Sequence, residues 1–575
     1  MLDPIKEGAV WAIMFLPLAS FAIITLVSFL GLTRSGAWSP RHSGYLTVVA
    51  IFASFLLSLW ALDSVADSDG ARIGFGSHEW LTVGGLEVNM GITLDGLTGV
   101  MLVVVTGVSL LVQIYSQEYM RDDEGYNRYF AFMSLFTASM LGLVLASSVL
   151  QLFVFWELVG LCSYLLIGFW FQKDSARRAA VKAFMVTRVG DLGFMIALLI
   201  VFTETGSLEI GEIHEAAIAG AIGSTALTFF ALGLFAGAAG KSAQFPLHTW
   251  LPDAMEGPTP VSALIHAATM VAAGVYLVAR FYPVFAVSED ALLTIAIIGS
   301  ITTIGAALLG IVATDIKRVM AYSTISQLGY MMMGLGVGGM VAAIFHLFTH
   351  AFFKALLFLG AGSVIHATEK QELDQLGGLA SKMPLTTVTF AVGTLAMIGI
   401  VPLAGFWAKD EILHFTEVNQ NAGVYALMLL SVFITSLFMT RLFIRTFLFK
   451  SRDPESREHA HDAEPAMTVP LLILAALAAI SGFVVFSGVG EAMGFPGGFG
   501  EFVFLEHAEE FEFNWDIVVL STVLGAGGMM VGYVFWANDA VPATRMGELF
   551  RPVYNVLYNG FYIDNIYQFV IDRII

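Results

Sequence analysis

The chain has 575 residues, of which 57% are hydrophobic and 13% charged, and its mean hydropathy is +0.79. Soluble proteins carry about 25% charged residues, so this composition excludes a soluble globular protein and indicates an integral membrane protein. The net charge of −19, without a basic stripe, gives no sign of nucleic-acid binding. With Cys162 as its only cysteine, the chain has no material for a disulfide or a cysteine-ligated redox cluster.

Apolar runs of about 20 residues recur along the whole chain. They fit membrane-spanning helices, whereas the strands of a β-barrel would alternate apolar and polar residues. The sequence therefore predicts an all-α, polytopic membrane protein. The first run lacks the basic region and cleavage site of a signal peptide, so we expect it to be a retained helix. Hydropathy places about fifteen spans, at residues 8–33, 43–65, 95–117, 128–147, 149–171, 182–203, 222–250, 258–283, 289–312, 315–336, 338–366, 384–414, 422–449, 466–488 and 514–536.

A short extramembrane β-hairpin is predicted within residues 71–94. The stretches 79–83 and 86–90 flank Gly84-Gly85, a two-residue connection that suits a hairpin. The hairpin separates two N-terminal helices, in residues 1–70, from a third helix, in residues 95–127.

Two of the predicted spans are interrupted in comparable places. Pro246 follows Lys241 closely in the seventh span, and Pro402 precedes Lys409 in the twelfth. Proline removes a backbone donor, and paired broken helices indicate inverted repeats around an ion site at the membrane midplane. Ordinary proline kinks are the alternative. We predict two inverted five-helix repeats, in residues 128–285 and 286–450, followed by two further helices, in residues 451–536.

Lysine and arginine residues are concentrated in alternate loops, for example at Arg34, Arg177, Arg318 and Arg452, while the intervening loops carry most of the acid. By the positive-inside rule, the basic loops are cytoplasmic and the N-terminus lies outside.

Several titratable residues lie inside the apolar segments. A charge at the bilayer centre costs about 2.5–3.5 kcal/mol, so such residues by default mark an ion or proton path. His346, His350 and Lys354 are spaced i, i+4, i+8, which places them on one helix face. Histidine exchanges protons near neutral pH, so this face predicts a relay. Structural hydrogen bonding and a metal site are the alternatives, the latter opposed by the adjacent lysine.

Glu157 has no polar sequence neighbour within one helical turn. We expect it to pair with Lys241 from another helix and to titrate with it as a coupled unit; a static salt bridge is the alternative. Arg188 and Asp191 are expected near Glu157, either tuning its charge or forming a structural pair. His266 is either functional or a satisfied core residue, and Lys317 either acts in the path or snorkels to the membrane edge.

Six stretches carry a family resemblance: 155–164, containing Trp156-Glu157; Arg188-Val-Gly-Asp191; 241–271, from Lys241-Ser-Ala-Gln-Phe-Pro through His266; 315–327, beginning Asp315-Ile-Lys317; His350-Ala-Phe-Phe-Lys354; and Gly405-Phe-Trp-Ala-Lys409-Asp410-Glu411. Together they resemble the largest antiporter-like subunit of respiratory complex I, called subunit L in bacteria and subunit 5 in mitochondria, and its counterpart in the related chloroplast-type complex.

The resemblance implies a role for each of these residues. Glu157 and Lys241 match the ion pair of the first repeat, and His266 matches the link between the half-channels. The central relay corresponds to His346, His350 and Lys354, with Lys317 in the second repeat. Lys409 and Asp410 match the exit in the broken twelfth helix. Arg188, Asp191, Pro246, Pro402 and Glu411 are expected to support these groups.

The resemblance also implies the surroundings of the chain. Flavin, iron–sulfur clusters and quinone are expected in partner subunits, with no cofactor or metal in this one. Expected partners are other membrane-arm subunits, among them a neighbouring antiporter-like subunit, and the lipid bilayer. A bacterial inner membrane is expected; thylakoid and mitochondrial inner membranes stay open. After Tyr558-Asn-Gly-Phe-Tyr-Ile-Asp564 the family continues into a lateral helix, so residues 537–575 are expected to begin that helix in a truncated chain.

Two other functions remain open at this point. One is a subunit of a multi-subunit cation/proton (Na⁺/H⁺) antiporter of the same superfamily. The other is a membrane scaffold without ion transport, for which Lys241, His350 and Lys354 would tolerate replacement.

Overall fold

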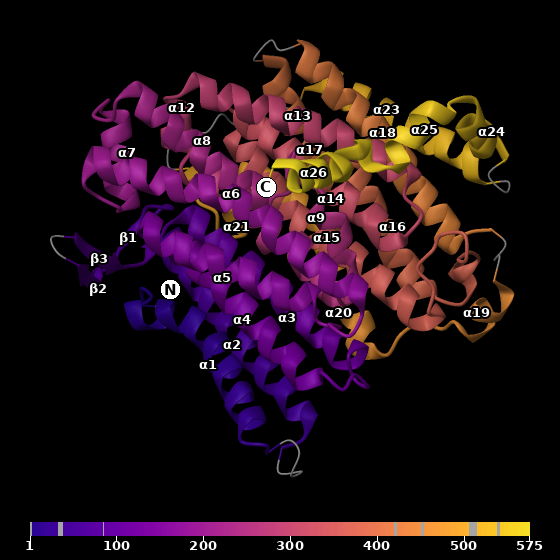
Figure 1. Cartoon of the computed structure of the whole chain (residues 1–575), viewed down its shortest axis with the longest axis horizontal. Helices are drawn as coiled ribbons and strands as arrows, with labels where there is room; N and C mark the ends of the chain where they lie inside the picture. Colours follow the sequence, from indigo (N-terminus) through magenta and orange to yellow (C-terminus); the bar gives the residue numbers. More distant parts are fainter. Residues whose placement is uncertain are drawn as a thin grey trace.

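The computed structural model describes residues 3–32, 38–83, 86–418, 422–449, 453–504, 514–537 and 541–574. It is a helical bundle whose first helices lie at its lower edge, whereas the C-terminal segment runs from the upper right to the centre of the view (Figure 1). The N-terminal part comprises α1 (Glu7–Phe29), α2 (Pro40–Ala66) and α3 (Gly96–Tyr119). The next part comprises α4 (Tyr126–Leu145), α5 (Val149–Ile167), α6 (Asp174–Thr205), α7 (Ile210–Ile218), α8 (Ser224–Lys241), α9 (Trp250–Asp253), α10 (Thr259–Ala267), α11 (Met270–Arg280) and α12 (Tyr282–Ala286).

The second half of the chain continues the bundle. It contains α13 (Glu289–Val312), α14 (Ile316–Gly336), α15 (Met340–Thr368), α16 (Pro384–Ile398), α17 (Ala404–Val418) and α18 (Ala422–Phe447). Beyond these lie α19 (Pro454–His459), α20 (Pro465–Ile480), α21 (Ser487–Ala492), α22 (Phe499–Phe504), α23 (Trp515–Trp536), α24 (Val541–Leu549), α25 (Arg551–Tyr558) and α26 (Ile563–Ile574). Short 3₁₀ turns lie at Ala254–Glu256, Leu379–Ser381, Ser481–Val485 and Gly560–Tyr562.

The predicted spans correspond well to these helices. Within the described residues, twelve helices are long and apolar enough to cross a membrane. The other three predicted spans coincide with α8, with α14 and with the interrupted pair α16–α17. An all-α polytopic fold is therefore confirmed. The inverted symmetry of the two five-helix repeats stays a prediction.

The predicted hairpin is also confirmed. Strand β2 (His78–Val83) pairs antiparallel with β3 (Leu86–Met90), and the two project from one edge of the bundle (Figure 1). The turn predicted at Gly84-Gly85 lies outside the described residues. A second short pair, β1 (Ile73–Gly74) with β4 (Thr93–Leu94), joins the hairpin to the start of α3.

Local sequence explains where several helices begin and end. Side chains of Asp95, Ser148 and Asp315 accept hydrogen bonds from backbone N–H groups in the first turns of α3, α5 and α14. These caps satisfy donors that a helix start leaves unpaired. At the other end of α6, Gly206 adopts a left-handed φ of 69°, which glycine accommodates without strain.

Both predicted interruptions are present. α8 ends at Lys241 and the chain passes through Pro246 before α9, while α16 ends before Gly399 and α17 starts at Ala404. A third interruption, between α10 and α11, was not predicted. There the Leu264 carbonyl accepts from the Thr269 hydroxyl at 2.7 Å as well as from the backbone N–H of Ala268 at 3.4 Å, and no proline or glycine marks the position.

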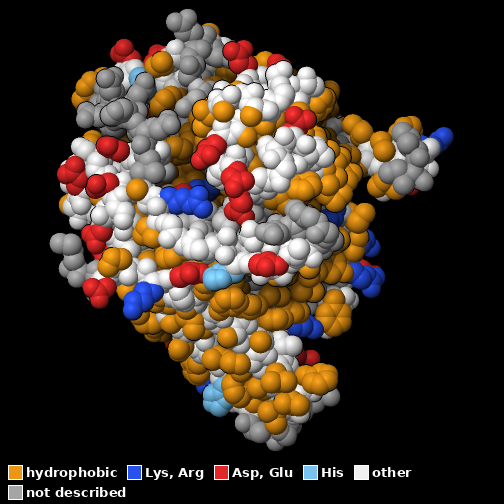
Figure 2. All heavy atoms as spheres, turned by 90° about the vertical axis from the view of Figure 1, so that its left-hand side faces the viewer, with side chains coloured by type: hydrophobic (Ala, Val, Ile, Leu, Met, Phe, Trp, Pro, Cys, Tyr) orange, Lys and Arg blue, Asp and Glu red, His pale blue; other side chains and the backbone are white. Residues whose placement is uncertain are grey.

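The most enclosed helices lie at the centre of the bundle. We compare the share of buried residues in an apolar 18-residue window of each span. This share is 100% in Thr259–Arg280 and 89% in α15, but only 28% in α23. Hydrophobic side chains cover a broad part of the outer surface, with acidic side chains gathered elsewhere (Figure 2). Exposed apolar residues such as Val189 and Leu192 of α6 fit contact with lipid. His266 of α10 and His346, His350 and Lys354 of α15 lie in this enclosed part, whereas His366 near the end of α15 is exposed.

Candidate proton-transfer site

A fully buried ion pair joins α8 to α6. Lys241 Nζ lies 3.0 Å from Asp191 Oδ2, and the two side chains are 0% and 2% exposed. Trp156 of α5 donates from Nε1 to the other carboxylate oxygen of Asp191 at 2.6 Å. Because Lys241 is the last residue of α8, the helix dipole also favours its positive charge. Asp191 thus has both oxygens engaged by groups from two other helices.

The predicted pair between Glu157 and Lys241 is wrong. Glu157 instead forms an ion pair with Arg188, and both side chains are only partly buried. Adjacent helical residues point about 100° apart, so Trp156 faces Asp191 while Glu157 faces Arg188. Arg188 and Asp191 were predicted as supporting residues. Arg188 pairs with Glu157, and Asp191 pairs with Lys241.

The predicted common face of α15 is confirmed. His346, His350 and Lys354 are completely buried, and the two imidazole rings lie 6.1 Å apart. His346 Nε2 hydrogen-bonds Gln327 Oε1 of α14 at 3.1 Å. Lys354 Nζ donates to Ser323 Oγ of α14 at 2.5 Å. The row therefore lies against α14.

His266 of α10 extends this row. Its ring is fully buried and lies 4.7 Å from the ring of Phe358, one turn after Lys354 on α15. Neither ring nitrogen has a hydrogen-bond partner among the described residues. Electrostatic interactions connect His350 with both His266 and Lys354. His266 thus lies beside α15, within electrostatic range of His350.

Lys317 does not snorkel, so that alternative is wrong. Its side chain is 3% exposed, and Nζ donates to the Gly257 carbonyl at 2.9 Å. Asp315 caps the same helix start through the backbone N–H groups of Lys317 and Arg318. The ammonium therefore points into the protein, toward the loop before α10.

The second interruption also holds a buried lysine. Lys409 Nζ of α17 donates to the Met397 carbonyl near the end of α16, so the side chain bridges the break. Asp410 Oδ2 accepts from Ser521 Oγ of α23 at 3.0 Å. Glu411 is 9% exposed. The carbonyl of Pro402 accepts from the indole N–H of Trp407 at 2.9 Å.

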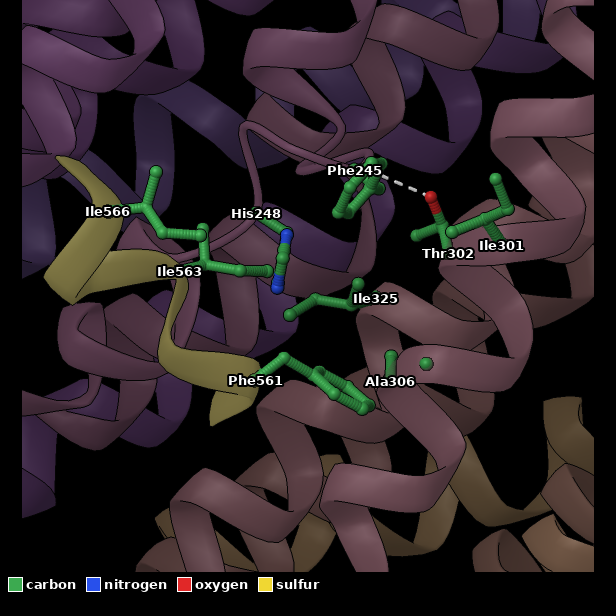
Figure 3. A pocket seen from close by; sticks show the side chains of 10 residues that line it. Phe245, His248, Ile301, Thr302, Ala306, Ile325, Phe561, Ile563 and Ile566 are labelled. Carbon is green, nitrogen blue, oxygen red and sulfur yellow. Dashed lines mark hydrogen bonds between the residues drawn. The ribbon is translucent and has the colours of Figure 1, made fainter. Parts of the chain in front are cut away.

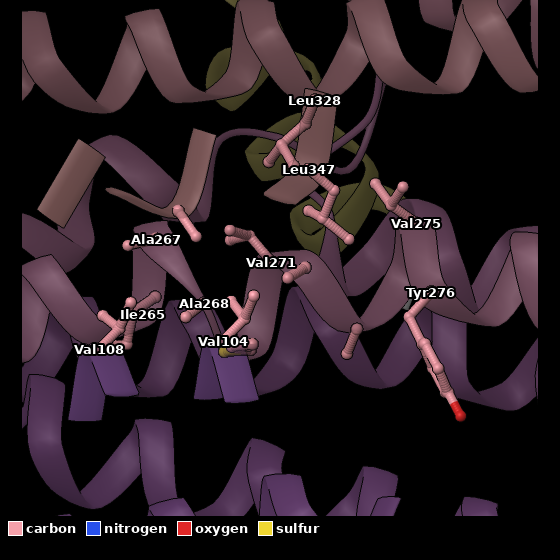
Figure 4. Packing of buried hydrophobic residues seen from close by; sticks show 14 of the residues in the cluster. Val104, Val108, Ile265, Ala267, Ala268, Val271, Val275, Tyr276, Leu328 and Leu347 are labelled. Atoms are coloured by element: carbon pink, nitrogen blue, oxygen red, sulfur yellow. The ribbon is translucent and has the colours of Figure 1, made fainter. Parts of the chain in front are cut away.

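The described side chains do not form an unbroken hydrogen-bonded chain from Lys241 to His266. Ser242, next to Lys241, donates to the Val271 carbonyl beyond the α10–α11 break at 2.6 Å. Apolar side chains surround this break, among them Ile265, Ala268 and Val271 (Figure 4). A proton that crosses here requires water or side-chain movement.

The C-terminal segment contacts the interruption after α8. Tyr567 of α26 donates from its hydroxyl to the Pro246 carbonyl at 2.6 Å. Lys182 of α6 pairs with Asp564 at 2.8 Å. A largely apolar cavity of about 370 Å³ is lined by His248 after the same interruption and by Phe561 and Ile563 of the C-terminal segment (Figure 3).

One buried ion pair was missed from the sequence. Arg280, near the end of the predicted span 258–283, is the last residue of α11 and forms a two-contact ion pair with Asp95. It also donates to Thr98 Oγ1 at 2.7 Å. One sequence signal pointed to this pair: Arg280 lies on the side of the membrane where the loops carry most of the acidic residues.

Comparison with known proteins gives the family. A family model described as "NADH:quinone oxidoreductase/Mrp antiporter, TM" matches residues 146–440, and one described as "NADH-Ubiquinone oxidoreductase (complex I), chain 5 N-terminus" matches residues 80–130. The NAD(P)H-quinone oxidoreductase chain 5 of Picosynechococcus sp. is 39% identical, covering 99% of this chain and 90% of its own length. The NADH-quinone oxidoreductase subunit L of Rickettsia felis is 40% identical, covering 97% of this chain and 88% of its own length.

Among solved structures, a chain of the Mrp complex from Dietzia sp. DQ12-45-1b matches with a TM-score of 0.80 and 28% identity. The match covers 97% of this chain and 59% of that longer chain. The sequence relatives and the family models agree in assigning the protein: the chain belongs to the NAD(P)H-quinone oxidoreductase chain 5 family, which includes the proteins named subunit L.

Proposed function

We propose that this chain is a proton-translocating membrane-arm subunit of an NADH- or NAD(P)H-quinone oxidoreductase. The observation that carries the proposal is the completely buried Lys241–Asp191 pair at the broken end of α8. Removing two charges from water costs several kcal/mol each, and replacing such a pair by apolar residues is often neutral or stabilising. A role in charge movement accounts for its presence. Relatives named chain 5 and subunit L support the assignment to this enzyme.

The proton steps follow from the way a buried pair titrates. A proton added to the Asp191 carboxylate removes the charge that stabilises the Lys241 ammonium in its apolar surroundings. Lys241 then transfers its proton, across a hydrated α10–α11 break, to the neutral imidazole of His266. From there the proton passes along Lys354 and His350. When the protonated Asp191 transfers its proton to the now neutral amine of Lys241, the ion pair re-forms and the site is reset.

The energy comes from outside this chain. Moving one charge against the membrane potential costs about 2.3 kcal/mol per 100 mV. In this proposal flavin, iron–sulfur clusters and quinone in partner subunits supply it, and this subunit carries no redox centre. Neighbouring membrane-arm subunits, one of them antiporter-like, transmit it through shifts in the buried charges.

The orientation and membrane are part of the proposal. The basic loops lie in the cytoplasm and the N-terminus outside, as the distribution of lysine and arginine predicts. We place the chain in a bacterial inner membrane. Thylakoid and mitochondrial inner membranes have the corresponding polarity.

Replacement of the buried lysines tests the function. Lys241→Met and Lys354→Met keep the length of the side chain and remove its charge. We expect both enzymes to assemble and to lose most of their proton pumping per electron, measured in sealed vesicles driven by the electron donor. Lys382→Met, at an exposed position, is the matched control. Wild-type pumping in both buried-lysine variants would contradict the proposal.

A cation/proton antiporter subunit is the second candidate. It is favoured by the 28% identity to a chain of the Mrp complex over nearly the whole length of this chain. Purification of the chain in its native complex separates the two. Flavin and iron–sulfur absorbance in the purified complex supports the oxidoreductase, whereas a colourless complex with Na⁺/H⁺ exchange supports the antiporter.

A further inference from the structure

We infer that protons leave the chain along the seam between α17 and α23, passing from Asp410 to His414 and then to Glu417. The inference rests on the proposed function. It adds the last acceptors of the path and their route to the surface.

The three side chains share one face of α17. Their spacing is i, i+4, i+7, which places them within one stripe of the helix. Leu413, on the same stripe, packs in a cluster with Ile517 of α23. Exposure increases along the stripe, since Asp410 is 8% exposed, His414 is half-buried and Glu417 is exposed. The stripe therefore leads from the core to the surface.

Polar side chains of α23 contact both ends of this stripe. Ser521, which is 5% exposed, donates from Oγ to Asp410 Oδ2 at 3.0 Å. At the start of α23, Asn514 donates from Nδ2 to Glu417 Oε2 at 3.2 Å. Two helices that only packed against each other would bury apolar side chains here. The seam instead keeps a polar group beside the first and last acceptors.

His414 is suited to the middle step. Its Nδ1 atom is buried and has no hydrogen-bond partner among the described residues. An imidazole accepts a proton at one ring nitrogen and releases one from the other. It can thus take the proton of the Asp410 carboxyl group and pass one to the Glu417 carboxylate, leaving Asp410 ionised and His414 neutral.

Other titratable groups surround the seam. Tyr425 of α18 lies within electrostatic range of Asp410, Glu417 and Asp516. From α14, the hydroxyl of Tyr330 donates to the Lys409 carbonyl at 3.3 Å. In the proposed order, Lys409 gives its proton to the Asp410 carboxylate, and the Asp410 carboxyl group then passes a proton to His414.

Chemical rescue tests the seam in the assembled enzyme. His414→Gly removes the imidazole and leaves a half-buried space that imidazole from solution can enter. We expect proton pumping per electron to fall at least fivefold and to be restored by added imidazole, in a vesicle assay that records donor oxidation in parallel. His214→Gly is the matched control, because His214 is also half-buried and lies on α7, away from the seam. Proton pumping per electron by the His214→Gly enzyme should equal that of wild type, with or without added imidazole.

A second variant keeps the test decisive if the His414→Gly enzyme does not assemble. Glu417→Gln alters an exposed residue and keeps an oxygen for Asn514, but its amide cannot carry the proton. We expect slower pumping that depends on the concentration of outside buffer. Two results would overturn the proposed exit route. One is wild-type pumping in the Glu417→Gln enzyme, and the other is a pumping defect in the His414→Gly enzyme that imidazole does not relieve. If Lys241→Met and Lys354→Met also pumped normally, the proposed function itself would fail, which distinguishes the two outcomes.

Discussion

The ammonium of Lys241 lies directly beside Gly160 of α5. A Cβ atom at position 160 would be 2.6 Å from Lys241 Nζ, which is closer than van der Waals contact permits. Gly160 is one turn after Glu157 and Trp156, so the same face of α5 provides the space for Lys241 and the indole that holds Asp191.

Gly160→Ala should therefore displace the Lys241 side chain without unfolding the protein, because the contacted atom is the far end of a flexible side chain. The expected result is a lower rate of proton pumping per electron at an unchanged amount of assembled complex. Gly305→Ala of α13 is a suitable control, since its nearest side-chain atom would be 3.8 Å away. Equal loss of pumping in both variants would mean that crowding at Lys241 is not the cause.

The Asp95–Arg280 pair should contribute stability rather than transport. Arg280→Met leaves the Asp95 carboxylate in a largely buried site without its partner, and breaking a buried pair in this way costs about 3–5 kcal/mol. We expect a lower dissociation temperature of the purified complex. The Asp95→Asn/Arg280→Met double variant, which removes both charges and keeps a cap on α3, should recover much of the loss. A double variant less stable than Arg280→Met would contradict this explanation.

The hydroxyl of Tyr567 should restrain the interruption after α8. Tyr567→Phe removes one hydrogen bond to the Pro246 carbonyl, which contributes about 1 kcal/mol. A change of this size increases local opening about fivefold. Hydrogen–deuterium exchange of residues 242–249 should therefore become faster. Tyr558→Phe, at an exposed position, serves as the control and should leave exchange in this loop unchanged.

The extramembrane helix α7 should make the protein sensitive to acid. Burial, assisted by the nearby positive charge of Arg280, lowers the pKa of His214 from 6.5 to about 4. In the unfolded chain this imidazole binds a proton below pH 6.5, whereas in the folded protein it remains neutral until about pH 4. Protonation therefore favours the unfolded state, and stability should fall as the pH decreases from 6.5 to 4.

His214→Gln removes this contribution. Thermal unfolding of the purified complex, measured at several pH values, should show a shallower decline below pH 6.5 for the variant than for wild type. Identical slopes for the two proteins would show that His214 titrates normally.

Much of this protein was determined by local sequence alone. Apolar runs indicate where the long helices lie, because a segment in lipid must satisfy its own backbone hydrogen bonds. Pro246 and the Gly399–Pro402 stretch fix two interruptions, since proline cannot continue the hydrogen-bond ladder. The i, i+4, i+8 spacing alone placed His346, His350 and Lys354 on one face. These features depend only on residues near one another in the chain.

The partners of the buried charges were decided by tertiary structure. Lys241 pairs with Asp191 rather than Glu157 because the rotation of α5 turns Trp156 inward and Glu157 toward Arg188, and no local pattern sets that rotation. The same holds for Arg280 with Asp95 and for Ser521 with Asp410, which are far apart in sequence. The α10–α11 break falls at Thr269, a residue type that most helices tolerate. Sequence specifies which side chains are costly to bury, whereas only the packing of helices against each other specifies what compensates each one.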